Sequence, residues 1–198
     1  MWLVAKRIQL GAISPEHLNL NGDLGNLVVL AKRLELRGVE STTHFLKGSE
    51  DLEDYDFVLL GHGSPSAWLQ LLDRHSNLIE KCVSYVNASG ALLAVASGAD
   101  HMYPALTGLD VAKGTWVSQS FDVDGVVGYK NSESKTSDLE WHNNALLTQL
   151  HGPLFAKNPS IADEFISRNG WADVSSVNGS LDELDALSEL SRKTAFEH

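Results

Sequence analysis

The run from Leu92 to Asp100 constrains the fold more than any other stretch of this chain. Its apolar part, Leu92 to Val95, ends abruptly in small residues, and a helix-compatible segment starts at His101. This pattern is typical of a buried parallel strand that turns sharply into a helix. Such elbows hold nucleophiles, because the turn residue is lifted out of the sheet and the helix start offers free backbone N–H groups. The elbow position is occupied by Ala96, whose methyl group cannot attack a substrate.

Short apolar segments alternate with amphipathic ones along most of the chain. Asp23 is expected to cap the first helix and Gly38 to end it. The expected strands are 2–10, 39–45, 56–60, 91–96 and 145–150, a hairpin covers 116–121 and 125–129, and the expected helical stretches are 23–38, 68–86, 159–168 and 181–191. This order predicts a single α/β domain over residues 1–198, with a mostly parallel central sheet and helices on both faces.

The predicted sheet also indicates where a ligand would bind. The strands at 56–60 and 91–96 are expected to be adjacent and parallel. Ligands of such folds bind outside the carboxyl ends of the strands, where the strand order switches. The loops at 61–65 and 96–100 should therefore lie together at a ligand site.

Composition excludes several classes of function. The net charge of −11 argues against nucleic acid or an anionic membrane as the main partner. No segment has the roughly 18 apolar residues of a membrane span. The single cysteine, Cys82, excludes an internal disulfide, fits a cytoplasmic protein and is expected to be a small buried hydrophobe. His62, His101 and His142 lack the spacing of metal ligands, so no metal site and no cofactor are expected.

Three motifs resemble a known family. The segment Asn21-Gly22-Asp23-Leu24-Gly25-Asn26 is similar to an opening Tyr-Gly-Asp-Arg-Gly-Asn motif, the elbow at 91–100 to a Cys-Gly-Gly-Tyr-Gln motif, and His151-Gly152-Pro153-Leu154 with Lys157-Asn158-Pro159 to a His-Gly-Pro-Leu-Leu-x-Lys-Asn-Pro motif. The family is the class I glutamine amidotransferases of the cobyric-acid-synthase-like (CobB/CobQ-like) type, and the chain is most similar to the glutaminase subunit of lipid II isoglutaminyl synthase (GatD). The resemblance covers about residues 17–170 and implies a flavodoxin-like three-layer sandwich.

The resemblance also implies a reaction. In this family the elbow cysteine attacks the side-chain amide of glutamine, a histidine activates the thiol, and ammonia passes to a Mur-ligase-like synthetase partner (MurT-like) that amidates a peptidoglycan precursor. Carried over, His151 is the base, and the N–H donors for the oxyanion and substrate come from Ser97 and Gly98 and from the loop containing Gly61 and Gly63.

The departures from the family motifs leave three readings open. Ala96 replaces the nucleophile, Ser64-Pro65 replaces Gln-Asp, and Lys130 and Ser132 replace an acid and a histidine. The first hypothesis is an impaired glutaminase subunit, and the second is a non-catalytic binding or regulatory subunit of the same fold. A more distant alternative is a serine hydrolase that uses Ser97 with His151 as base, against the plain interpretation that Ser97 caps a helix and His151 bonds a backbone carbonyl.

Overall fold

A six-stranded sheet forms the centre of the computed structural model, which describes residues 7–48, 50–175 and 179–194. The strands follow the order β2-β1-β3-β4-β8-β7, and all neighbours are parallel except the antiparallel pair β7 and β8. Their bounds are β1 Ile8–Ile13, β2 Ser41–Leu46, β3 Phe57–Leu60, β4 Ala91–Val95, β7 Leu139–His142 and β8 Ala145–Thr148. The expected adjacency of the third and fourth strands is confirmed, with Phe57 opposite Ala91 in a parallel register.

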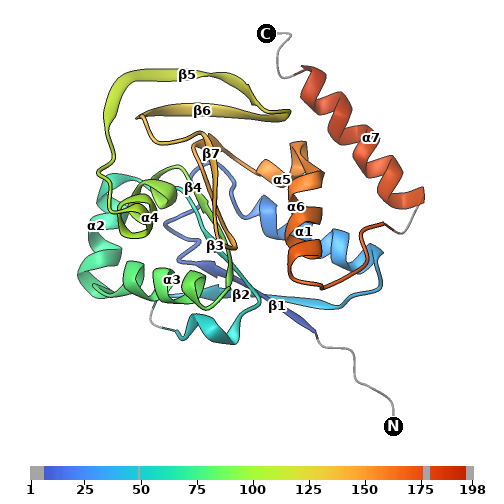
Figure 1. Ribbon diagram of the computed structural model, residues 1–198, viewed down its shortest axis with the longest axis horizontal. Helices are drawn as coiled ribbons and strands as arrows, with labels where there is room; N and C mark the ends of the chain where they lie inside the picture. The colour runs from blue at the N-terminus through green and yellow to red at the C-terminus, as the bar shows by residue number, and fades with distance from the viewer. Residues whose placement is uncertain (1–6, 49, 176–178, 195–198) are drawn as a thin grey trace.

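Helices cover both faces of this sheet, as Figure 1 shows. One face packs against α1 (Gly25–Leu36), α5 (Leu154–Lys157) and α6 (Pro159–Arg168), and the other against α2 (Pro65–Arg74), α3 (Leu78–Asn87) and α4 (Ser97–Thr107). Alternate residues of β3 point into the two apolar layers, Phe57 and Leu59 into one and Val58 and Leu60 into the other. The predicted mostly parallel α/β sandwich is confirmed.

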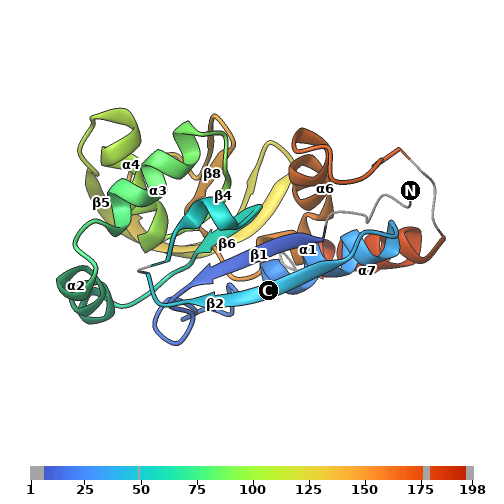
Figure 2. The ribbon, with the colours of Figure 1, turned by 90° about the horizontal axis from the view of Figure 1, so that it is seen from below.

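A second, three-stranded antiparallel sheet lies beside the first. It consists of β5 (Lys113–Val123), β6 (Val126–Ser134) and the short β9 (Leu150–His151), in the order β5-β6-β9. The long pair β5 and β6 spans the molecule above α4 in Figure 1. The last helix, α7 (Gly179–Thr194), lies at the outer edge beyond α6 in Figure 1, and it overlaps α1 in the view from below in Figure 2.

Several expected elements differ from the structure. The first strand begins at Ile8 and continues to Ile13, beyond its expected end at residue 10, while residues 2–6 of the expected strand lie outside the described residues. The helical stretch 68–86 is two helices, because the polar segment His75-Ser76-Asn77 forms a turn between them. The strand 145–150 is divided at Gln149, so that Leu150 and His151 join the second sheet.

The ends of other elements also differ from the expected ones. The hairpin strands extend well beyond 116–121 and 125–129, and β7 was not predicted. Asp23 does not cap α1, which begins after Leu24 without a side-chain cap. Gly38 does end that helix region, with a φ of 76° that favours glycine. Cys82 is fully buried, as predicted. Among the described residues, no helix has the length and apolar character needed to cross a membrane.

Candidate functional site

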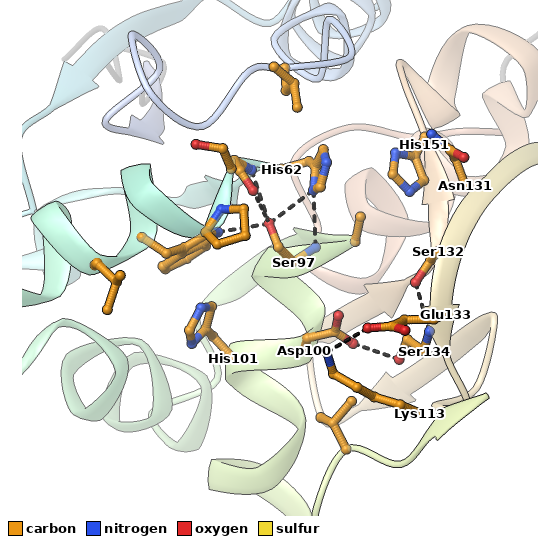
Figure 3. Close-up of a pocket in the computed structure, with 18 of the residues that line it drawn as sticks. His62, Ser97, Asp100, His101, Lys113, Asn131, Ser132, Glu133, Ser134 and His151 are labelled. Atoms are coloured by element: carbon orange, nitrogen blue, oxygen red, sulfur yellow. Dashed lines mark hydrogen bonds and ion pairs between the residues drawn. The ribbon is translucent and has the colours of Figure 1, made fainter. Parts of the chain in front are cut away.

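A pocket of about 720 Å³ opens at the carboxyl ends of β3 and β4, where the strand order reverses between β1 and β3. This is the position at which parallel α/β sheets bind ligands. Figure 3 shows the pocket between the loop after β3, the start of α4 and the strand β6. Its lining includes Leu20, His62, Gly63, Ser64, Pro65, Trp68, Leu69, Leu72, Ala96, Ser97, Asp100, His101, Val111, Lys113, Trp116, Asn131, Ser132, Glu133, Ser134 and His151.

The elbow at Ala96 has the strained geometry of a nucleophile turn without a nucleophile. Ala96 has φ 49° and ψ −110°, and its N–H donates to the Thr148 carbonyl at 2.7 Å. This conformation is costly for a residue with a Cβ. Gly98 lets the helix start lie against β3, because a Cβ there would come 2.4 Å from the Leu60 carbonyl oxygen. The chain therefore retains the backbone of an elbow that presents position 96 to the pocket.

The hydroxyl of Ser97 links the elbow to the loop after β3. It accepts from the Gly63 N–H at 3.0 Å and from Trp68 Nε1 at 2.7 Å, and lies 3.1 Å from the Gly63 carbonyl and 2.9 Å from His62 Nδ1. Both lone pairs of the hydroxyl are thus used by N–H donors, and its proton has two acceptors nearby. The expectation that Ser97 caps a helix is wrong, because its side chain makes no capping bond to α4.

Two of the backbone N–H groups expected to be oxyanion donors, those of Ser97 and Gly63, already have partners, and so does the His62 N–H between Gly61 and Gly63. The Ser97 N–H donates to His62 Nδ1 at 3.3 Å, the Gly63 N–H to Ser97 Oγ, and the His62 N–H to Asp23 Oδ2 at 2.7 Å. An oxyanion hole needs donors that point at the place where charge develops on the substrate. In this structure those three donors are directed at protein atoms instead.

His151 lies at the same pocket as Ala96, in edge-to-face contact with His62 at 4.7 Å between ring centroids. Its Nδ1 contacts the side-chain amide of Asn21, and its buried Nε2 has no hydrogen-bond partner among the described residues. Burial, with a smaller contribution from His62, lowers the pKa of His151 to about 4. Burial also lowers the pKa of His62. Both imidazoles are therefore neutral near pH 7.

Asp23 is a residue of this site that sequence reasoning assigned to another role. Its carboxylate is fully buried; Oδ2 accepts from the His62 N–H at 2.7 Å, and Oδ1 has no hydrogen-bond partner among the described residues. Burial raises the pKa of this carboxyl to about 6, while the nearby backbone N–H groups of His62 and Gly152 oppose the rise. Asp23 therefore fixes the loop that carries His62 and lies close to the Gly152 backbone, which follows His151.

Some of the remaining candidate residues line the pocket, and others have a packing or ion-pair role away from it. Gly63, Ser97 and Ser132 line the pocket. Gly61 and Gly98 are packing positions, and a Cβ at Gly61 would lie 2.0 Å from the Leu18 carbonyl oxygen. Lys130 is buried in an ion pair with Asp138 at 2.5 Å.

Sequence reasoning also missed the partner of Ser97. The structure brings Ser97 to His62 rather than to His151, and the Gly-His-Gly turn directly after a buried strand was the available signal. Within the described ranges, no group of three His, Cys, Asp or Glu side chains could hold a metal ion.

Comparisons with known proteins bear on the fold. No family model and no curated protein matches the chain. A glutamine amidotransferase from Thermotoga maritima has a TM-score of 0.52 at 13% identity, covering 96% of this chain and 94% of that one. A two-domain protein with DJ-1/ThiJ/PfpI-like and ferritin-like domains from Anabaena variabilis has a TM-score of 0.50 at 11% identity, covering 92% of this chain and 55% of that one. The chain therefore has the flavodoxin-like fold of class I glutamine amidotransferases, and at these identities the similarity shows the fold alone.

Proposed function

We propose that this chain is a GatD-like glutamine amidotransferase domain that has lost glutaminase chemistry and serves as a ligand-binding subunit. The observation that carries the proposal is the pairing of the Ser97 N–H with His62 and of the Gly63 N–H with Ser97, next to an elbow whose central residue is Ala96. The attacking thiol is then missing, and the N–H groups of Ser97 and Gly63 are bonded to protein atoms instead of being left for an oxyanion.

The partner in this proposal is a Mur-ligase-like synthetase in the cytoplasm, acting on a peptidoglycan precursor. It rests on the three motifs that resemble the CobB/CobQ-like family. The net charge of −11 supports a protein partner rather than nucleic acid. In this function the pocket is a binding site whose occupancy is sensed by the partner subunit, and no ammonia is made.

The experiment is ammonia release from glutamine by the purified chain, alone and with a candidate Mur-ligase-like synthetase. The proposal predicts background release in both cases and a stable complex in size-exclusion chromatography. Glutamine-dependent release above background, with or without the synthetase, would contradict the loss of glutaminase chemistry. Failure of the two chains to elute together would contradict the proposed partner alone.

A second candidate function is a serine hydrolase, favoured by the 2.9 Å contact between Ser97 Oγ and His62 Nδ1. A nucleophile and base at this distance are the signature of an activated serine. Against it, the Ser97 hydroxyl is held by the Gly63 N–H and the Trp68 indole. Hydrolysis of p-nitrophenyl acetate that Ser97→Ala abolishes and His151→Gln preserves would favour this function.

A further inference from the structure

We propose that the pocket binds a small apolar cation, an aromatic or aliphatic body that carries one protonated amine, with the amine at the Asp100 carboxylate. The inference rests on the proposed function in one respect, that the pocket binds a ligand without hydrolysing glutamine. It adds the chemical class of the ligand, which the fold does not specify.

The Asp100 carboxylate is the polar anchor of the proposed site. Its Oδ1 accepts from Ser134 Oγ at 2.7 Å and from Gln149 Nε2 at 2.8 Å, which fixes the carboxylate between α4 and β6. Both donors are neutral; the nearest ammonium is that of Lys113, which pairs with Glu133 and whose pKa is raised chiefly by Glu133 and to a smaller extent by Asp100. Figure 3 shows that the second carboxyl oxygen points away from Ser134. One oxygen of a positioned anion is thus left for a cationic ligand.

The other charges of the pocket favour a cation over an anion. Lys113 is the one cation among the described lining residues, and its ammonium pairs with Glu133 at 2.5 Å. The pKa of each of the three lining histidines is lowered, chiefly by burial, so these rings are neutral near pH 7. The formal charge of the lining is therefore −1. A carboxylate or phosphate would enter this pocket without a free cationic partner.

The walls of the pocket require an apolar body on the ligand. Trp68 and His101 stack at 4.0 Å between ring centroids and form one wall. Three of the exposed large apolar side chains of the molecule, Leu20, Leu69 and Trp116, line the same pocket. Exposed apolar groups that gather at one concave site mark a place where apolar surface is covered. Aromatic walls also attract a cation through their ring faces.

Three matched probes test the inference: phenethylamine, its uncharged analogue 2-phenylethanol, and the anion 3-phenylpropionate. Binding is measured near pH 7 at low salt by calorimetry and by quenching of tryptophan fluorescence, since Trp68 and Trp116 line the pocket. We expect phenethylamine to bind at least about tenfold more tightly than 2-phenylethanol, because a charge-assisted hydrogen bond to a carboxylate is worth this much. We expect no binding of 3-phenylpropionate at about 10 mM, a weak-fragment concentration.

Two variants test whether Asp100 is responsible for the preference for the amine over the alcohol. Asp100→Asn keeps an oxygen that can accept from Ser134 and Gln149 and removes the charge, so the ratio between amine and alcohol should fall to about one. Glu53→Gln makes the same change of charge on η1 (Leu52–Asp54), outside the pocket, and should leave the ratio unchanged. If Asp100→Asn does not fold, the comparison of the three probes on the unmodified chain still tests whether the pocket prefers a cationic ligand.

The inference is overturned if 2-phenylethanol or 3-phenylpropionate binds as tightly as phenethylamine. It is also overturned if no probe binds, or if Asp100→Asn folds and keeps the full preference for the amine. Ammonia release from glutamine is measured on the same preparations, and its appearance would contradict the proposed function instead. The two failures are therefore distinguishable.

Discussion

Ala96 adopts a backbone conformation that favours glycine, and the strain at this one residue preserves the shape of the elbow. Its φ of 49° and ψ of −110° lie outside the regions that residues with a Cβ commonly adopt. Two contacts hold this turn in place: Gly98 packs closely against the end of β3, and the Thr148 carbonyl accepts a hydrogen bond from the Ala96 N–H. The surrounding structure therefore imposes the conformation on a residue that has no chemistry to perform.

Replacing this alanine with glycine tests the strain directly. Ala96→Gly should change the free energy of unfolding by no more than about 1 kcal/mol in either direction, because relief of the positive φ offsets the lost methyl burial. Ala94→Gly is the matched control, a fully buried alanine of β4 with ordinary strand geometry, and should lose about 1–2 kcal/mol. Urea denaturation measures both. Equal losses in the two variants would show that Ala96 is not strained.

The protonation of His151 gives a second test at the residue scale. Its pKa in the folded protein is lowered to about 4 by burial, below the value of about 6.5 in the unfolded chain. The unfolded state therefore binds more protons between these values, and this residue stabilises the fold above pH 6.5 and loses that contribution as the pH falls towards 4. Asp23, with its pKa raised to about 6, acts in the opposite direction over much of this range.

We expect the ring signals of His151 in an NMR titration to stay those of a neutral imidazole down to about pH 5. We also expect His151→Gln to lose less unfolding free energy than the unmodified chain as the pH falls from 6.5 to 4, because glutamine does not titrate. A half-protonation point near 6.5 would contradict the buried, neutral imidazole. So would a variant whose dependence on pH equals that of the unmodified chain.

At the scale of elements, two buried arginines hold the outer helices against α1. Arg33 binds Asp163 of α6 and Asp185 of α7, each at 2.6 Å, and Arg37 binds the same Asp163 at 2.9 Å. Both arginine side chains are nearly fully buried, at 3% and 4% exposure, while Asp163 is 22% and Asp185 43% exposed. Asp163 is thus the shared anion of two buried cations.

We expect Asp163→Ala to cost about 3 kcal/mol, because it leaves buried guanidinium charge without its main partner. Asp185→Ala should cost about 1 kcal/mol or less, because that carboxylate is half exposed and Arg33 keeps Asp163. Chemical denaturation measures the two values, and hydrogen exchange should show faster exchange in α7 alone for Asp185→Ala. Equal costs for the two variants would contradict the central role of Asp163.

The elements that sequence predicted well are those with long apolar patterns and clear end signals. The strands β3 and β4 and the helix α6, which begins at Pro159, were placed within one residue at each end. The errors lie in segments whose secondary structure depends on tertiary contacts. Leu150 and His151 leave the path of β8 because they pair with Tyr129 and Lys130 of β6, a contact that no local pattern carries. The same holds for β7, whose half-buried residues lack a strong strand pattern.

At the scale of the whole molecule, the sequence located the site and did not reveal how its polar groups are paired. The loops after β3 and β4 meet, and Ala96, Ser97 and His151 line one pocket, because parallel strands bring their carboxyl ends to one edge. The pairing of Ser97 with His62 and the burial of Asp23 beneath both histidine loops depend on the exact approach of three segments. Such an arrangement follows from packing and not from residue spacing.

Glutamine-dependent ammonia release by Ala96→Cys tests most directly whether the N–H groups of Ser97 and Gly63 are unavailable to a developing oxyanion. We expect release at background for this variant as for the unmodified chain, because the N–H groups of Ser97 and Gly63 remain bonded to His62 and Ser97. Robust turnover by Ala96→Cys would contradict this expectation and would show that only the thiol was missing.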